Sequence, residues 1–72
     1  MVPMETIPES LTVRQRQVLE LWLEGVTYRE LADRLGISPE TVNPHLKAIA
    51  RKLGTRRISR VGLREALREA VR

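Results

Sequence analysis

Apolar side chains recur three or four residues apart in three successive stretches of this chain, and a glycine follows each stretch. The apolar positions are Val18, Leu19, Trp22 and Leu23, then Leu31, Ala32 and Leu35, then Val42, Leu46, Ile49 and Leu53. This spacing places each set on one face of a helix. Glycine just after such a stretch is typical of a helix C-cap, so Gly25, Gly36 and Gly54 mark where three helices end.

Residues that favour helix N-caps stand before each stretch. Threonine followed three residues later by Gln or Glu is the pattern of a capping box, in which side chain and backbone bond reciprocally. The candidate caps are Thr12 with Gln15, Thr27 with Glu30, Ser38 before Pro39, and Ser59 ahead of a last apolar set of Val61, Leu63, Leu67, Ala70 and Val71. The pattern therefore predicts an all-α domain over residues 11–72, with four helices at about 12–24, 28–35, 39–53 and 60–71. Residues 1–10, with two prolines, are expected to form an irregular arm.

Only Gly36, Ile37 and Ser38 separate the second and third predicted helices. Two short helices joined by a tight, glycine-containing turn form a helix-turn-helix, in which the second helix enters the DNA major groove. Glycine supplies the left-handed backbone that the turn needs, and Ile37 can fill the corner between the helices. We therefore expect the helix from Pro39 to Leu53 to be the recognition helix.

Pro44 lies inside that helix. A proline in a helix interior lacks the amide that would bond to the carbonyl four residues earlier, here that of Glu40, and costs about 3 kcal/mol. The apolar spacing nevertheless runs unbroken from Val42 to Leu46 and Ile49. We therefore expect a continuous third helix with a distorted first turn, and an apolar contact from Pro44 to a thymine methyl group.

The outward face of the third helix carries the candidate chemistry. Opposite the apolar face lie Glu40, Pro44, Lys47 and Arg51, with Asn43 and Ala48 beside them. Asn43 can make paired hydrogen bonds to adenine, and Lys47 can donate to guanine. Lys47, Arg51 and Lys52 can neutralise phosphates. An ordinary solvated helix surface is the alternative interpretation.

Charge adds to this picture. The formal net charge is +4, and residues 55–72 hold six arginines against Glu65 and Glu69. A basic half favours a polyanionic partner, although a solvated basic surface would have the same composition. We expect the arginines after Gly54 to add to DNA affinity.

Three segments resemble one known family in register: LTVRQRQVLELWLEG (11–25), YRELADRLGIS (28–38) and TVNPHLKAIARKLGT (41–55). They are similar to the LuxR-type (GerE-type) helix-turn-helix domain of bacterial transcription regulators, over about residues 11–71. The resemblance implies a four-helix fold, binding of double-stranded DNA by the third helix and, in many members, a homodimer through the fourth. It implies base contacts from Asn43, Pro44 and Lys47, and phosphate contacts from Thr41 and the region of Tyr28.

The chain departs from the family pattern at three places. Gln15 stands where Glu is usual, Asn43 stands where Lys is frequent, and the connection Thr-Arg-Arg-Ile (55–58) is about two residues longer. The promoter-recognition domain of a sigma factor has a similar LTxR…ELA..LGIS pattern and stays an alternative, as does a degenerate helix-turn-helix that binds protein. His45, Ile49 and the fourth helix favour the LuxR type.

Other classes of function find little support. The chain has no cysteine and one histidine, which argues against a disulfide framework, a metal cluster or a Ser/His catalytic pair. No nucleophile–base arrangement is evident, so we predict no enzyme, no catalytic residue, no metal and no cofactor. The sequence has no membrane span and no secretory signal, and the expected location is the cytoplasm.

Overall fold

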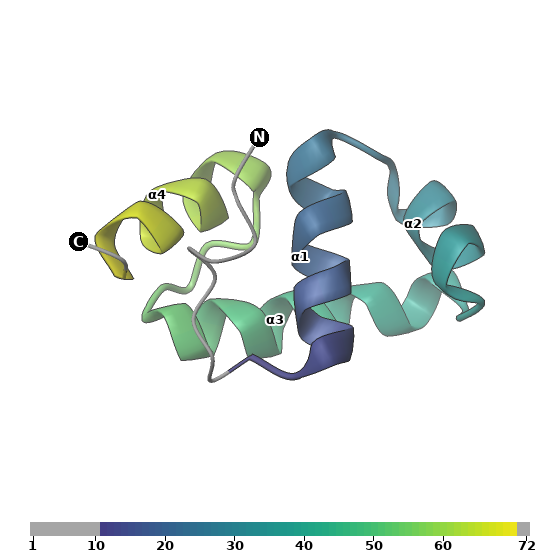
Figure 1. Ribbon diagram of the computed structural model, residues 1–72, viewed down its shortest axis with the longest axis horizontal. Helices are drawn as coiled ribbons and strands as arrows, with labels where there is room; N and C mark the ends of the chain where they lie inside the picture. Colours follow the sequence, from purple (N-terminus) through teal and green to yellow (C-terminus); the bar gives the residue numbers. More distant parts are fainter. Residues whose placement is uncertain (1–10, 71–72) are drawn as a thin grey trace.

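Four α-helices and one short 3-10 helix make up residues 11–70, the part of the chain that this computed structural model describes (Figure 1). They are α1 (Val13–Glu24), α2 (Tyr28–Leu35), α3 (Val42–Leu53) and α4 (Arg60–Ala70), with the 3-10 helix η2 (Pro39–Thr41) leading directly into α3. No strand occurs within these residues. The all-α, four-helix prediction is confirmed, while the expected arm at residues 1–10 lies outside the described residues.

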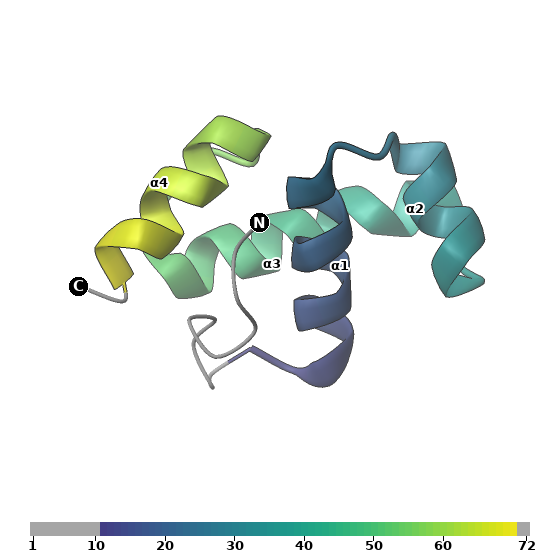
Figure 2. The same cartoon turned by 45° about the horizontal axis from the view of Figure 1, so that its top comes forward.

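Helix α3 extends along most of the molecule, and the other helices pack on it (Figures 1 and 2). Helix α1 crosses α3 near its middle and contacts α2, α3 and α4. Helices α2 and α4 lie toward opposite ends of α3, α2 beside its N-terminal end and α4 beside its C-terminal half. The three helices leave one side of α3 open to solvent.

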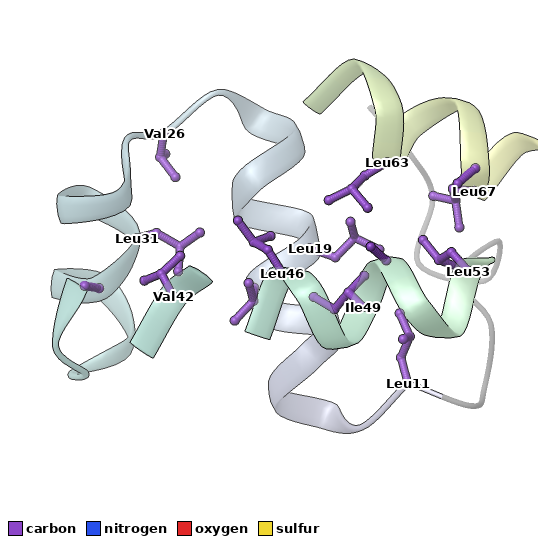
Figure 3. Packing of buried hydrophobic residues seen from close by; sticks show 14 residues of the cluster. Leu11, Leu19, Val26, Leu31, Val42, Leu46, Ile49, Leu53, Leu63 and Leu67 are labelled. Carbon is purple, nitrogen blue, oxygen red and sulfur yellow. The ribbon is translucent and has the colours of Figure 1, made fainter. Parts of the chain in front are cut away.

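The buried face of α3 holds the core together. Val42, Leu46, Ile49 and Leu53 are all buried, as their spacing predicts. Leu46 and Ile49 point toward α1, and side chains of α1 and α4 meet them in one continuous apolar cluster (Figure 3). Burying apolar surface stabilises the fold by about 25 cal/mol per Å². The predicted inward side of α3 is therefore confirmed, and the opposite side is the one available to a partner.

One core prediction is wrong. Val61 was expected to face inward from α4, yet 56% of its surface is exposed. The buried positions of the helix are Gly62, Leu63, Ala66 and Leu67, which share one face at helical spacing. Val61 precedes Leu63 by two residues, which is about 200° around the helix axis and therefore on the far side. Val71, also expected in the core, lies outside the described residues.

The predicted caps are largely present. Thr12 with Gln15 and Thr27 with Glu30 both form reciprocal capping boxes, and Gly25, Gly36 and Gly54 are left-handed C-caps with φ of 103°, 67° and 82°. Ser59 Oγ accepts from the Gly62 amide at 3.0 Å, which confirms that cap as well. Hydrogen bonds from the Thr27 amide and hydroxyl hold the pKa of the Glu30 carboxyl below its ordinary value of 4.5.

The start of the recognition helix differs from a simple serine cap. Ser38 occupies the N-cap position of η2, but its side chain makes no capping hydrogen bond. Its carbonyl instead accepts from both the Thr41 amide, at 3.0 Å, and the Thr41 hydroxyl, at 2.7 Å. This 3-10 turn precedes the α-helix that begins at Val42, so Pro44 falls in the first α-helical turn. Amides there have no intrahelical acceptor, and the expected continuous helix with a distorted first turn is confirmed.

Candidate nucleic-acid interface

The open side of α3 carries two exposed cations, Lys47 and Arg51, with the exposed ring of Pro44 one turn before Lys47. These residues lie opposite Leu46 and Ile49, which are completely buried. Asn43 and Ala48 flank the row and are half-buried. The predicted base-facing residues Asn43, Pro44 and Lys47 therefore all lie in the N-terminal half of α3, away from the core.

The cations of α3 differ in their internal contacts. Within residues 11–70, neither Lys47 nor Arg51 takes part in an ion pair or a side-chain hydrogen bond. Lys52, predicted to contact phosphate, is also exposed, but its Nζ donates to Gln15 Oε1 at 2.9 Å. A phosphate that binds Lys52 would therefore compete with this bond, whereas Lys47 and Arg51 have no such bond to exchange.

The two remaining predicted phosphate contacts are Thr41, just after the turn between α2 and α3, and Tyr28, at the opposite end of α2. Thr41 is exposed and closes η2 through its hydroxyl. Tyr28 is the first residue of α2 and is half-buried, with its ring centroid 5.0 Å from that of Trp22 and the rings tilted by 47°. Both side chains are held by neighbours, so any contact they make to a phosphate starts from a fixed position.

Three of the arginines beyond Gly54 make contacts within the domain. The Arg60 guanidinium lies 4.1 Å over the Trp22 ring, donates from Nε to the Trp22 carbonyl at 2.7 Å and also donates to the Val26 carbonyl. Arg64 donates to the Leu23 carbonyl at 3.0 Å. These carbonyls belong to the last turn of α1 and the residues after it, where cations are favourable because helix C-termini carry partial negative charge.

Sequence reasoning missed this junction between α4 and α1. Trp22 Nε1 donates to the Ile58 carbonyl at 2.9 Å, from the longer connection before α4. Arg57 in the same connection pairs with Glu65 at 3.4 Å. The helical spacing of apolar residues carries no information about such contacts, because arginine forms them through a long side chain to carbonyls far away in sequence. Three of the expected DNA-binding arginines are therefore engaged within the domain.

Two other kinds of site find no support in the described chain. Among residues 11–70, no group of three or more His, Cys, Asp or Glu residues could hold a metal ion. The same part of the chain has no helix of the length and apolarity that crossing a membrane requires.

A short helix, a glycine turn and a second helix with a cationic outward face define a helix-turn-helix domain. The family model described as bacterial regulatory proteins, luxR family, matches residues 9–63, which is more than half of the chain. The chain belongs to this luxR family, a class of DNA-binding transcription regulators rather than of enzymes.

The curated relatives of the chain are also named as transcriptional regulators. The chain is 44% identical over 46 residues to the transcriptional regulatory protein UhpA of Escherichia coli, covering 64% of this chain and 24% of that protein. It is 48% identical over 46 residues to the probable transcriptional regulatory protein SgaR of Hyphomicrobium methylovorum, covering 64% and 22%. A putative transcriptional regulator of Haloferax volcanii is 46% identical over 55 residues, covering 65% and 10%. The chain thus spans a quarter or less of these relatives, and no solved structure matches it.

Proposed function

We propose that this domain binds double-stranded DNA with sequence preference, with η2 and α3, residues 39–53, in the major groove. The observation that carries the proposal is the outward face of α3, where Lys47 and Arg51 are exposed and have no internal partner within residues 11–70. In a helix-turn-helix, the N-terminal half of the recognition helix approaches the base edges, and cations contact the DNA phosphates.

The residues divide into two roles under this proposal. Asn43, Pro44 and Lys47 face base edges, because they lie in the N-terminal half of α3 on its open side. Tyr28, Thr41, Arg51 and Lys52 contact phosphates on either side of the groove. The phosphate contacts fix the register, and the base contacts supply sequence preference.

The proposal extends to the setting of the domain. The names of its relatives and its family support a role in bacterial transcription regulation, and we place the protein in the cytoplasm with its DNA. We also propose a homodimer through α4, whose outward side exposes Val61. Sedimentation of the chain with and without Val61→Asp tests the dimer, which should dissociate in the variant.

Titration of duplex DNA at several salt concentrations tests the main proposal. Neutralising about four phosphates gives a slope of log affinity against log salt near −3.6. Lys47→Ala should weaken binding to a preferred duplex by about 1–3 kcal/mol if Lys47 contacts a base. Arg68→Ala is the matched control, since it removes one positive charge from the exposed side of α4, and it should change affinity far less. A flat salt response, or equal effects of the two substitutions, would contradict the proposal.

A further inference from the structure

The proposed recognition element, residues 39–53, carries a negative charge as well as its cations. Glu40 is the only acidic residue in it. It lies in η2, one turn before Pro44, and its side chain is exposed. Within residues 11–70, the Glu40 carboxylate takes part in no hydrogen bond and no ion pair. The carboxylate is therefore available to a hydrogen-bond donor outside the domain.

Helix geometry places Glu40 in line with Lys47. The chain turns by about 120° and rises by about 2.0 Å per residue in the 3-10 helix from Glu40 to Val42. It turns by about 100° and rises by about 1.5 Å per residue in α3, from Val42 to Lys47. Glu40 and Lys47 therefore lie within about 20° of each other around the axis and about 11 Å apart along it. Both side chains leave the open side of the element, over different base pairs of a bound duplex.

The backbone that carries Glu40 is held on both sides. The ring of Pro39 fixes its own φ angle, and the Pro39 carbonyl accepts from the Val42 amide. The amide and the hydroxyl of Thr41 both donate to the Ser38 carbonyl, at 3.0 and 2.7 Å. Glu40 therefore starts from a fixed position at the N-terminal end of the element, where recognition helices contact base edges.

The major groove offers a carboxylate few partners. An ionised carboxylate only accepts hydrogen bonds, and the donors in this groove are the amino groups of cytosine, N4, and adenine, N6. Guanine and thymine present acceptor oxygens there, and adenine places its N7 acceptor beside N6. The N4 amino group is the only polar group that cytosine presents. A carboxylate in the groove is therefore repelled least, and bound best, at cytosine.

We propose that Glu40 accepts a hydrogen bond from the N4 amino group of a cytosine, and so specifies a C·G pair where the start of η2 enters the groove. This inference rests on the proposed DNA binding and deepens it, because it assigns a base to one further residue of the open side. The competing role for Glu40 is a solvated charge at a helix N-terminus, where negative side chains are favourable. In that role it would repel the phosphates of every duplex alike.

The experiment begins with selection of preferred duplexes from a random pool by the unaltered 72-residue chain. Each cytosine of the selected site is then replaced in turn by N4-methylcytosine, in which a methyl group takes the place of the N–H that faces the major groove while the other N–H keeps the base pair. Affinities are measured for the unaltered chain and for Glu40→Ala. Asp33→Asn is the matched control, since it removes one exposed negative charge from α2 instead.

One cytosine should respond to methylation. Binding of the unaltered chain should weaken there by about tenfold or more, as for a hydrogen bond to a charged group, and binding of Glu40→Ala should change by less than about twofold, because the two partners are coupled. Glu40→Ala should lose the preference for cytosine at that position, yet bind an unrelated duplex about two- to threefold more tightly, since it repels phosphates less. Asp33→Asn should keep both the preference and the response to methylation.

Three results would overturn the inference while leaving DNA binding intact. The first is that no cytosine of the site responds to methylation, which is measured on the unaltered chain and does not depend on the folding of a variant. The second is an equal response in Glu40→Ala. The third is an equal gain of affinity by Glu40→Ala on preferred and unrelated duplexes. Failure of the unaltered chain to enrich or bind any duplex is a different outcome, which overturns the proposed function itself.

Discussion

The outward face of α3 and the junction between α4 and α1 both carry positive charge, but they use it differently. On α3, Lys47 and Arg51 are exposed and have no internal partner within residues 11–70. At the junction, the guanidinium of Arg60 is bound to two carbonyls and an aromatic ring. The first arrangement leaves the charge for an external anion, and the second uses it to join two helices.

A count of basic residues therefore overstates the positive charge that is available to bind DNA. Residues 55–72 have more arginines than any other part of the chain, yet Arg57, Arg60 and Arg64 bind a carboxylate or backbone carbonyls of the same domain. Arginine suits this role because its planar group offers several donors at once. The α3 face, with fewer cations, is the better candidate for counterion release on DNA binding.

The largest expected effect is on stability, from Arg60→Ala. The substitution removes two hydrogen bonds to carbonyls of the α1 end and the contact with the Trp22 ring. Since hydrogen bonds to charged groups contribute about 1.5–3 kcal/mol, we expect the free energy of unfolding to fall by about 2–3 kcal/mol. For a domain of this size the melting temperature should drop by roughly 10 °C or more. Urea unfolding followed by circular dichroism measures the change.

Arg60→Lys is the matched control, because it keeps the charge but lacks the planar fork. It should also destabilise the fold, and the salt dependence of DNA binding should stay the same in both variants under conditions where they are folded. A variant with unchanged stability and a salt slope reduced by about one unit would place Arg60 with the DNA-binding cations instead.

Gly62→Ala should destabilise the same junction by a smaller amount. Alanine in place of a helical glycine ordinarily stabilises by about 1 kcal/mol. Here the added Cβ would lie 2.5 Å from Arg57 Cβ and 3.1 Å from Ser59 Oγ, so the connection before α4 has to move. We expect a net loss of about 1–2 kcal/mol in the free energy of unfolding, typical of overpacking. Unfolding of a Gly62→Ala, Arg57→Gly double variant, which should recover part of the loss, checks the cause.

Arg51→Ala tests the outward face of α3. Because its side chain has no partner within residues 11–70, its loss should leave stability within about 0.5 kcal/mol. DNA affinity should fall by a similar factor on all duplexes, and the salt slope should decrease by about 0.9. Binding isotherms on a preferred and an unrelated duplex measure both quantities. A loss confined to the preferred duplex would instead make Arg51 a base-contacting residue.

The two regions also differ in how much of each could be predicted from the sequence. The helices, their glycine C-caps and the buried stripe from Val42 to Leu53 follow from local spacing, since each depends on residues within one or two turns. The contact of Arg60 with Trp22, in contrast, joins residues that are far apart in the sequence. Val61 was mispredicted for a simpler reason: it lies about 200° around the helix axis from Leu63, so the spacing itself separates it from the buried face of α4.

The smallest expected effect concerns Lys52, whose position is intermediate between the two regions. Its Nζ donates to Gln15 Oε1, which also accepts from the Thr12 amide in the capping box of α1. Gln15→Glu keeps the box, places a negative charge in the first turn of α1 and adds an ion pair to Lys52. These changes each stabilise a helix or an exposed pair by a few tenths of a kcal/mol, so the free energy of unfolding should rise by about 0.5 kcal/mol.

The same substitution should weaken DNA binding, because Lys52 is held more strongly and the surface gains a negative charge. If Lys52 contacts a phosphate, the salt slope should fall by up to about 0.9. Gln15→Ala provides the opposite control: it loses the capping box, so stability falls, but it releases Lys52 from this bond and should not weaken binding. Equal DNA affinity in Gln15→Glu, Gln15→Ala and the unaltered chain would exclude Lys52 from the phosphate contacts and leave it as a structural link between α3 and α1.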